Sequence, residues 1–317
     1  MGASNRMNME TNWLNLLACP LCQQAALRLQ EIERERDGRI REGILVCRGC
    51  GEPFPVLEGI PRLVPADLRS PEANAFLAAQ SGRLGEPERS LPTTRGVSIP
   101  SREAALDALA EMQVRDRLAP TYDADIAWKA DPGGLRRVLE RLDMAADSLT
   151  LDAGCGTGRL LPSLLKRCDR VVGCDLSVES MRLFQHSHPE YARRVLLVQA
   201  DLTRLPFASE RADRVVSLEV LQHIPSLQSQ KTALAEVRRV LRSQRRFVVS
   251  AYHDHPFWRL YWRIVRGYGK EGYLRCGSFG YRFGPREFSN LLGTQFTVRD
   301  LRTASLGRLL VATCTAA

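Results

Sequence analysis

Short apolar segments alternate with helical patterns over the central part of the chain. Helical spacing of apolar residues is found at 135–142 and 159–167, and apolar runs occur at 148–151, 170–174, 195–199, 212–218 and 246–251. Strands that alternate with helices are typical of parallel βαβ units. The pattern therefore predicts an α/β fold on a mostly parallel sheet, continued by a helix at 285–292 and strands at 297–301 and 309–313.

The regions on either side of this pattern differ from it. Residues 13–65 contain paired cysteines and two strand-like segments, whereas residues 66–110 are rich in Pro, Ser, Gly and Ala and show no sustained period. We expect a small domain at 13–65, a linker or partly helical connector at 66–110, and a larger domain at 111–317. An aromatic and basic insertion is expected at about 252–283.

The composition is that of an ordinary globular protein, with 44% hydrophobic and 26% charged residues. The longest apolar runs are shorter than the roughly 18 residues of a membrane span, and the first 13 residues lack the apolar core of a secretory signal. The nine cysteines are odd in number and unevenly placed, which argues against a disulfide framework. A reducing, cytoplasmic location is expected.

The formal net charge of +9 admits two interpretations. A basic protein attracts phosphate, so a nucleic-acid partner is possible. However, only four of the 45 basic residues are lysines, and arginines spread along the whole chain also arise from genomic base composition.

Two CxxC pairs, Cys19–Cys22 and Cys47–Cys50, are separated by 24 residues. Each pair can direct two thiolates at one metal ion, and four sulfurs complete the tetrahedron that Zn²⁺ prefers. Strand-like segments at 27–34 and 40–46 flank Asp37-Gly38, so a hairpin would bring the second pair beside the first. Four cysteine ligands leave no open coordination position, so we expect a structural zinc rather than a catalytic one.

The segments around these cysteines, Leu16-Leu17-Ala18-Cys19-Pro20-Leu21-Cys22 and Phe54-Pro55-Val56-Leu57-Glu58-Gly59-Ile60-Pro61, resemble the zinc-ribbon activator subunit of tRNA and release-factor methyltransferases. The similarity covers residues 13–65. In that family the ribbon stabilises a partner methyltransferase, which implies that here the ribbon is fused to its partner.

A glycine-rich loop, Asp152-Ala153-Gly154-Cys155-Gly156-Thr157-Gly158, follows the first central strand. A strand, a glycine turn and a helix form a nucleotide-binding unit, because glycine lets the backbone approach a ligand closely. The alternating glycines differ from the spacing of a dinucleotide loop. An acidic residue two positions ahead is typical of S-adenosylmethionine loops, where Asp152 would face the charged amino-acid end.

The next strand ends at Asp175, 21 positions after Gly154. At this distance a carboxylate can accept hydrogen bonds from both ribose hydroxyls, with Leu176 beside it. The alternative role for Asp175 is to cap the helix that begins near Ser177.

With the segments Ala200-Asp201-Leu202, Leu205-Pro206-Phe207 and Glu219-Val220-Leu221-Gln222-His223, residues 112–251 resemble class I S-adenosylmethionine-dependent methyltransferases of the quinone-biosynthesis and small-molecule group. The resemblance implies a Rossmann-like seven-stranded sheet with helices on both faces. It also implies that Asp201 and Leu202 bind adenine and that Glu219 lies along the methionine moiety.

Methyl transfer needs alignment and exclusion of water, and an oxygen or nitrogen acceptor also needs a general base. His223 and His253 are the candidates for that base, with His255 and Glu219 as further possibilities. Helix packing is the alternative role for His223, and a thin HxH metal pattern is the alternative for His253.

Ten of the 21 aromatic residues fall within residues 252–283, interleaved with arginines. Such a segment can stack on bases, line a pocket for a hydrophobic or anionic small molecule, or form a lid helix that buries its aromatic side on the core. In the last case Phe257, Trp258, Tyr261, Trp262 and Val265 would be buried.

We therefore expect an S-adenosylmethionine-dependent methyltransferase with a structural zinc, acting on an O, N or C acceptor that is most simply a small molecule. The first alternative is an RNA methyltransferase that grips its substrate with the ribbon and the basic segment. The second is a non-catalytic regulator or adaptor. The sequence indicates no membrane span and does not indicate an oligomeric state.

Overall fold

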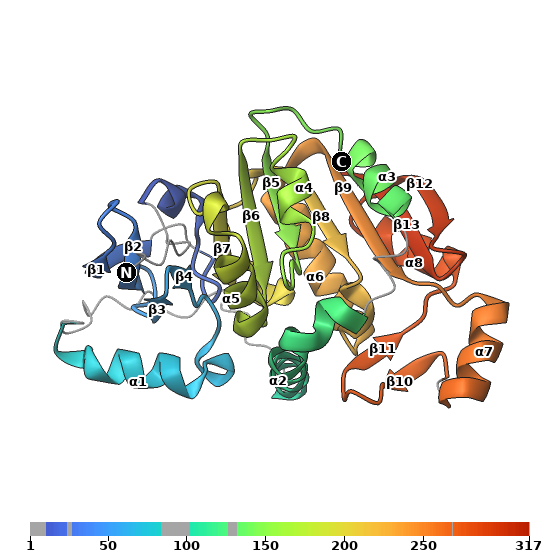
Figure 1. The fold of residues 1–317 in the computed structure, drawn as a ribbon, viewed down its shortest axis with the longest axis horizontal. Helices are drawn as coiled ribbons and strands as arrows, with labels where there is room; N and C mark the ends of the chain where they lie inside the picture. Colours follow the sequence, from blue (N-terminus) through green and yellow to red (C-terminus); the bar gives the residue numbers. More distant parts are fainter. Residues whose placement is uncertain (1–10, 24–26, 84–101, 126–131, 268, 317) are drawn as a thin grey trace.

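A seven-stranded sheet forms the centre of the computed structural model, which describes residues 11–23, 27–83, 102–125, 132–267 and 269–316 (Figure 1). The strand order is β12-β13-β9-β8-β5-β6-β7. The strands β9, β8, β5, β6 and β7 are parallel, while β13 pairs antiparallel with β9 and β12. The bounds are β5 Leu149–Ala153, β6 Arg170–Asp175, β7 Val195–Gln199, β8 Ala212–Leu218, β9 Leu241–Tyr252, β12 Thr297–Ala304 and β13 Leu309–Thr315. The expected α/β fold is confirmed.

Helices cover both faces of the sheet, because successive side chains of its buried strands point to opposite sides. On one face, residues such as Val172, Leu196 and Phe247 pack with α6 (Leu227–Val240) and α8 (Pro285–Gly293). On the other face, their neighbours Val171, Leu197 and Val248 pack with α3 (Pro132–Leu142), α4 (Leu161–Leu164) and α5 (Val178–Ser187).

The predicted connector at 66–110 contains helical structure in its described part. The helix α1 (Pro71–Ala79) is capped by the Ser70 hydroxyl, and α2 (Arg102–Asp125) begins before residue 110 and continues well past it. Residues 84–101 of this stretch lie outside the described residues. The helix α2 contacts α5, which brings α2 across one end of the sheet (Figure 1).

The N-terminal cysteines lie beside a four-stranded antiparallel sheet in the order β1-β2-β3-β4, with bounds Leu27–Arg34, Ile40–Cys47, Pro53–Leu57 and Ile60–Pro61. The expected hairpin is present, and Gly38 has a φ of +87° in its turn, which a residue with a side chain rarely adopts. Residues 13–65, called the cysteine module below, lie at the β7 edge of the large sheet (Figure 1).

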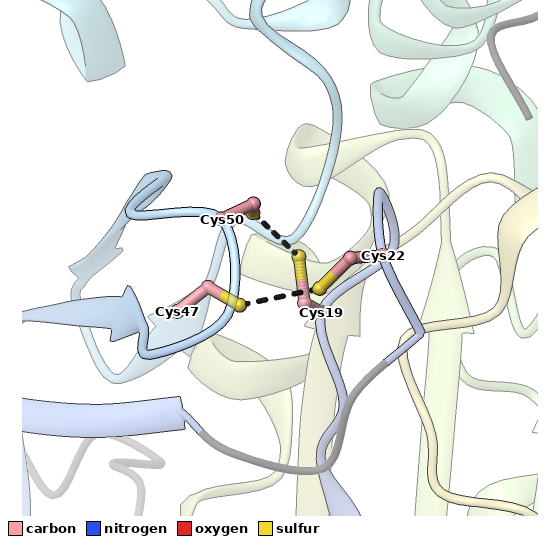
Figure 2. Close-up of side chains that lie close together, drawn as sticks. All are labelled: Cys19, Cys22, Cys47 and Cys50. Carbon is pink, nitrogen blue, oxygen red and sulfur yellow. Dashed lines mark hydrogen bonds between the residues drawn. The ribbon is translucent and has the colours of Figure 1, made fainter. Parts of the chain in front are cut away.

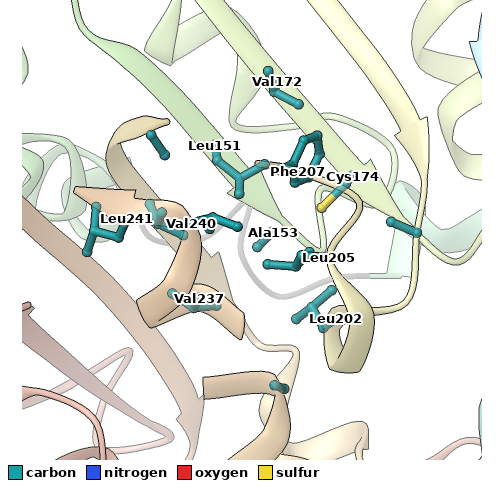
Figure 3. Packing of buried hydrophobic residues seen from close by; sticks show 14 of the residues in the cluster. Leu151, Ala153, Val172, Cys174, Leu202, Leu205, Phe207, Val237, Val240 and Leu241 are labelled. Atoms are coloured by element: carbon teal, nitrogen blue, oxygen red, sulfur yellow. The ribbon is translucent and has the colours of Figure 1, made fainter. Parts of the chain in front are cut away.

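Backbone hydrogen bonds join the cysteine module to the large sheet. The amide of Leu63 donates to the Gln199 carbonyl at the end of β7 (3.0 Å), and the amide of Ala18 donates to the Pro206 carbonyl (2.9 Å). Phe207 belongs to a hydrophobic cluster that includes Leu17 of the module and Leu151 of β5 (Figure 3). The module and the large sheet therefore share one core.

The helix after the glycine loop is shorter than the sequence pattern predicts. It covers only Leu161–Leu164, not 159–167. The guanidinium of Arg194 donates to the carbonyls of Leu165, Cys168 and Asp169, so that residue 165 onward turns back towards β6. None of the helices in the described ranges is both long and apolar enough to cross a bilayer.

Candidate active site

A cleft of roughly 1170 Å³, including its open mouth, lies where the carboxyl ends of β5, β6, β7 and β8 meet. In open α/β sheets this edge is the usual ligand position. The predicted cofactor residues that line the cleft are Gly154, Gly156, Asp175, Leu176, Asp201, Leu202 and Glu219. The predicted Asp152, Ala153 and Gly158 are not among the residues that line it.

The three loop glycines have different surroundings. All have positive φ angles, of +89° for Gly154, +53° for Gly156 and +75° for Gly158. A Cβ at Gly154 would lie 2.2 Å from Val220, and a Cβ at Gly158 would lie 2.4 Å from Phe184, whereas a Cβ at Gly156 would meet no atom within 4 Å. Gly154 and Gly158 therefore serve internal packing, and Gly156 is the glycine that leaves space for a ligand.

Asp175 ends β6 with its carboxylate under the glycine loop. One oxygen accepts from the Gly156 amide and the other from the Ser177 amide, both at 2.8 Å. The cap of α5 is the Ser177 hydroxyl, which accepts from the Ser180 amide, so the alternative capping role belongs to Ser177 and not to Asp175. Burial raises the pKa of Asp175. Each carboxylate oxygen keeps a lone pair for a further donor.

Asp201 follows β7 and caps the short 3₁₀ helix Leu202–Arg204. Its carboxylate accepts from the Thr203 amide (2.9 Å) and from the Thr203 hydroxyl (2.7 Å). Both Asp201 and Leu202 line the cleft, at the carboxyl end of β7, two strands away from the strand that leads into the glycine loop. The structure thus brings the predicted ribose and adenine residues to adjacent strand ends.

Glu219 follows β8 in an unusual backbone conformation, with a φ of +57°. It lines the cleft, and its Oε1 is buried without a hydrogen-bond partner among the described residues. Burial raises the pKa of Glu219 to about 7, against the attraction of Arg159 and Arg115. A strained residue with an unsatisfied buried carboxyl is typical of a ligand site.

Asp152 is a second buried carboxyl, at the end of β5. Only 3% of its surface is exposed, and burial raises its pKa to about 7, with Asp175 adding repulsion. Asp152 is not among the residues that line the cleft.

The helix α2 forms a wall of the cleft that sequence reasoning missed. Ala104, Asp107, Ala108, Glu111, Arg115 and Tyr122 all line it. The Arg115 Nε donates to Glu111 (2.7 Å), and the guanidinium of Arg115 lies 5.7 Å from the centre of the Tyr122 ring. The pair Glu111 and Arg115 lies one helical turn apart, which is the signal in the sequence that points to this face.

His223 lines the cleft, but both of its ring nitrogens face protein groups. The Nδ1 lies 2.6 Å from the Phe279 carbonyl, which assigns the proton to Nδ1, and the Nε2 lies 3.3 Å from the Gln222 amide nitrogen. Burial lowers the pKa of His223 well below its ordinary value. The ring is therefore neutral and engaged, and its predicted role as a base has little support in this geometry.

His253 is not among the residues that line the cleft. Its Nδ1 lies 2.9 Å from the Gly307 carbonyl, and its ring lies against the ring of His255. The alternative metal site at this pair also lacks support, because in the described part of the chain the metal-binding geometry found is that of the N-terminal cysteines.

The segment 252–283 has two separate parts. Its C-terminal part forms the hairpin of β10 (Glu271–Tyr273) and β11 (Phe279–Tyr281), and Ser278 donates to Glu111 (2.8 Å) behind the cleft wall. Its N-terminal part is α7 (Pro256–Arg266). The lid interpretation predicts that the apolar side chains of this helix are buried against the core. That expectation is wrong for Phe257, Tyr261 and Val265, which are 62%, 40% and 50% exposed. The Trp262 side chain lies outside the described part.

The four cysteines of the module converge (Figure 2). Their sulfurs all lie within 4.8 Å of one another, with Cys19 and Cys50 at 3.6 Å and Cys22 and Cys47 at 3.4 Å. The hydrogen bond from Cys19 lowers the pKa of Cys47 to about 5, which favours the thiolate that a metal needs. This arrangement fits one tetrahedral metal ion.

Two family models match parts of the chain. A model described as "Methyltransferase domain" matches residues 151–249, which contain the glycine loop, Asp175, Asp201 and Glu219. A model described as "Trm112p-like protein" matches residues 13–59, which contain all four module cysteines.

Curated relatives agree with the methyltransferase match. A malonyl-[acyl-carrier protein] O-methyltransferase of Methylovorus sp. is 33% identical over 138 residues, or 41% of this chain and 45% of the relative. A ubiquinone/menaquinone biosynthesis C-methyltransferase of Syntrophotalea carbinolica is 28% identical over 54% of this chain and 74% of the relative. The first curated relatives are matched over less than half of their own length.

A solved structure has the same fold. It is a complex between the Haloferax volcanii Trm112 methyltransferase activator and a putative methyltransferase, at 16% identity and a TM-score of 0.50, covering 64% of this chain and 97% of that one. Residues 13–59 of the chain are therefore similar to Trm112p-like proteins, and residues 151–249 match the methyltransferase domain model.

Proposed function

We propose that the protein transfers a methyl group from S-adenosylmethionine to a small-molecule acceptor. The observation that carries the proposal is the pair of buried carboxyls, Glu219 and Asp175, on either side of the open space at Gly156. A ligand that carries a cationic end and a ribose fits this pair. S-adenosylmethionine supplies an activated methyl group when it is bound.

Each end of the cleft has groups that match one part of the cofactor. The Glu219 carboxylate would accept from the ammonium group, and the guanidinium groups of Arg115 and Arg159, which line the same end, would attract the carboxylate. Asp175 would accept from the ribose hydroxyls, and Asp201 with the backbone of Leu202 would hold the adenine. The unsatisfied Oε1 of Glu219 supports this orientation, because a buried carboxyl without a donor is costly.

The acceptor side of the cleft favours a small molecule over RNA. Asp107 and Glu111 of α2 line the cleft near Ile224 and Pro225, so the wall offers carboxylates and apolar surface. Carboxylates repel a phosphate backbone. The ubiquinone/menaquinone biosynthesis relative supports the same choice, whereas a tRNA methyltransferase relative of Arabidopsis thaliana supports the RNA alternative.

The cysteine module would hold a structural zinc ion and support the catalytic domain within the same chain. Arg182 of α5 supports this role, since it pairs with Glu58 (2.7 Å) of the module and with Glu72 (2.9 Å) of α1. A partner methyltransferase is not needed to explain the module, because its core is already shared with the large sheet.

Calorimetry of the purified chain tests the proposal. We expect S-adenosylmethionine and S-adenosylhomocysteine to bind at one site, and the Glu219→Gln variant to lose affinity for both. Absence of binding would favour the non-catalytic adaptor. If the cofactor binds but bulk tRNA also binds tightly, with an affinity that falls steeply as salt rises, the acceptor is RNA instead.

A further inference from the structure

The helix α7 exposes an apolar stripe that no part of the described chain covers. Phe257, Leu260, Tyr261 and Ile264 recur at three- and four-residue spacing, so they share one face of the helix, with Val265 at its border. Leu260 and Ile264 are 59% and 73% exposed. A monomeric protein rarely exposes this much contiguous aliphatic and aromatic surface without a use for it.

The side of α7 that borders the stripe next to Val265 is held to the protein. The Trp258 indole donates to the Leu306 carbonyl (2.8 Å), and the Arg308 guanidinium lies 4.2 Å from the centre of the indole ring. The Leu306 side chain, at the tip of the β12–β13 turn, is 88% exposed and adds to the apolar surface. The contacts of Trp258 fix the rotation of the helix about its axis, and in this orientation the stripe faces solvent.

The charges next to the stripe are predominantly positive. Residues 256–275 contain five basic residues and a single acidic one, Glu271. Arg259 is paired with Asp254 (2.7 Å) and Lys270 with Glu287 (2.9 Å), whereas Arg263 is exposed one turn after Arg259. An occupant of this surface must therefore accept apolar side chains and arginines side by side.

An anionic bilayer meets both requirements. A helix with aromatic and aliphatic residues on one face and arginines on the other lies in the membrane interface, where the apolar face enters the acyl boundary and the arginines contact phosphates. RNA fits less well, since Leu260, Ile264 and Val265 offer no ring to stack on a base. The helix is at the edge of the molecule, opposite the cysteine module, where a flat surface can approach it (Figure 1).

We propose that α7, together with Leu306, docks the protein on an anionic phospholipid bilayer. The hairpin of β10 and β11 follows α7 in the chain, and its Phe279 carbonyl accepts a hydrogen bond from His223, which lines the cleft. The protein would sit on the membrane peripherally. The proposal stands apart from the identity of the methyl donor or acceptor.

Sedimentation of the full chain with phospholipid vesicles tests this. We expect the protein to sediment with phosphatidylcholine vesicles that contain phosphatidylglycerol, to bind pure phosphatidylcholine vesicles more weakly, and to lose part of its binding as salt rises. The double variant Phe257→Ser/Ile264→Ser should bind at least roughly tenfold more weakly, since two large apolar side chains no longer leave water. Arg263→Glu should reduce binding to the anionic vesicles selectively.

The matched control is Leu227→Ser, because Leu227 is similarly exposed, at 57%, on another surface. This variant should bind the vesicles like the original chain. Because the altered side chains are exposed, all variants should keep the circular dichroism spectrum of the folded protein. Failure of the unmodified chain to sediment with anionic vesicles would overturn the proposal. A dimer in analytical ultracentrifugation that depends on Phe257 and Ile264 would also overturn it, if vesicle binding does not depend on these residues. The same holds for tRNA binding that depends on them.

Discussion

The carboxylate of Asp175 accepts a hydrogen bond from the backbone amide of Gly156 at 2.8 Å, which ties the end of β6 to the middle of the glycine loop. The same carboxylate accepts from the Ser177 amide at the start of α5. Asp175 thus holds the loop in shape and at the same time faces the cleft. A change at this residue removes a ligand contact and loosens the loop that surrounds the ligand.

We expect Asp175→Ala to weaken S-adenosylmethionine binding by roughly 10- to 100-fold, the effect of losing a hydrogen bond to a charged group. Isothermal titration calorimetry measures this. Asp175→Asn should lose less, because an amide oxygen still accepts from one backbone amide. Asp147→Ala, an exposed acid ahead of β5, serves as the control. Unchanged affinity of Asp175→Ala would remove the ribose assignment.

The binding of S-adenosylmethionine should depend on pH through Glu219. Burial raises the pKa of this carboxyl to about 7, and only the ionised form attracts the ammonium group. Affinity should therefore fall as the pH drops from 8 to 6, approaching roughly tenfold per pH unit once the pH is below the pKa. In Glu219→Gln the affinity should be low and should lose this dependence, and a pH profile that matches the original chain would contradict the role of Glu219.

The same carboxyl should lower the stability of the protein without ligand. Burial in the folded state raises the pKa of Glu219 from 4.5 to about 7. The protonated carboxyl therefore stabilises the folded state, and this stabilisation is lost as the pH rises from about 4.5 through 7. Glu219→Gln should consequently raise Tm at pH 8 by about 2–5 °C and leave it unchanged at pH 4. Differential scanning calorimetry at the two pH values checks the sign, and a lower Tm at pH 8 would contradict it.

Much of the fold follows from local pattern. Strands such as β7 and β8 are buried on both faces, so their sequences are mostly unbroken apolar runs and their bounds could be predicted closely. The cysteine pairs and the glycine loop are similarly compact signals, since all of the interacting residues lie within a few positions or on one hairpin.

The parts that could not be predicted depend on distant contacts. The helix α2 carries Arg115 and Glu111 into the cleft through its packing on α5. Their one-turn spacing places both on one face of a helix, but it does not indicate that this face lines the cleft. The early end of α4 depends on Arg194, thirty positions downstream of Leu164 along the chain. The spacing of apolar residues in α7 predicts an apolar helix face, but it does not predict whether that face is buried on the core or exposed to solvent.

Removal of the metal should destabilise the whole chain. Trp13, Leu17 and Phe54 of the cysteine module belong to the same hydrophobic cluster as the large sheet, so the two parts are expected to unfold together. The purified protein should contain about one zinc per chain, the number that four thiolates hold. A chelator or Cys47→Ser should lower the single Tm, measured by calorimetry, whereas Cys276→Ser, outside the quartet, should not. Two separate transitions would contradict the shared core.

The loop glycines provide a matched pair of substitutions. An alanine Cβ at Gly158 would lie 2.4 Å from the Phe184 ring, whereas one at Gly156 would meet open space in the cleft. Both positions have positive φ, so each alanine costs roughly 1–2 kcal/mol of backbone strain, and only Gly158→Ala adds a steric clash. Gly158→Ala should therefore lower Tm clearly more than Gly156→Ala.

In contrast, Gly156→Ala should reduce S-adenosylmethionine affinity more than its small loss of stability explains, because its methyl group occupies ligand space. Thermal unfolding and calorimetry on the two variants separate these effects. Equal losses of stability would contradict the packing role of Gly158, and full affinity in Gly156→Ala would show that the ligand does not approach the loop at Gly156.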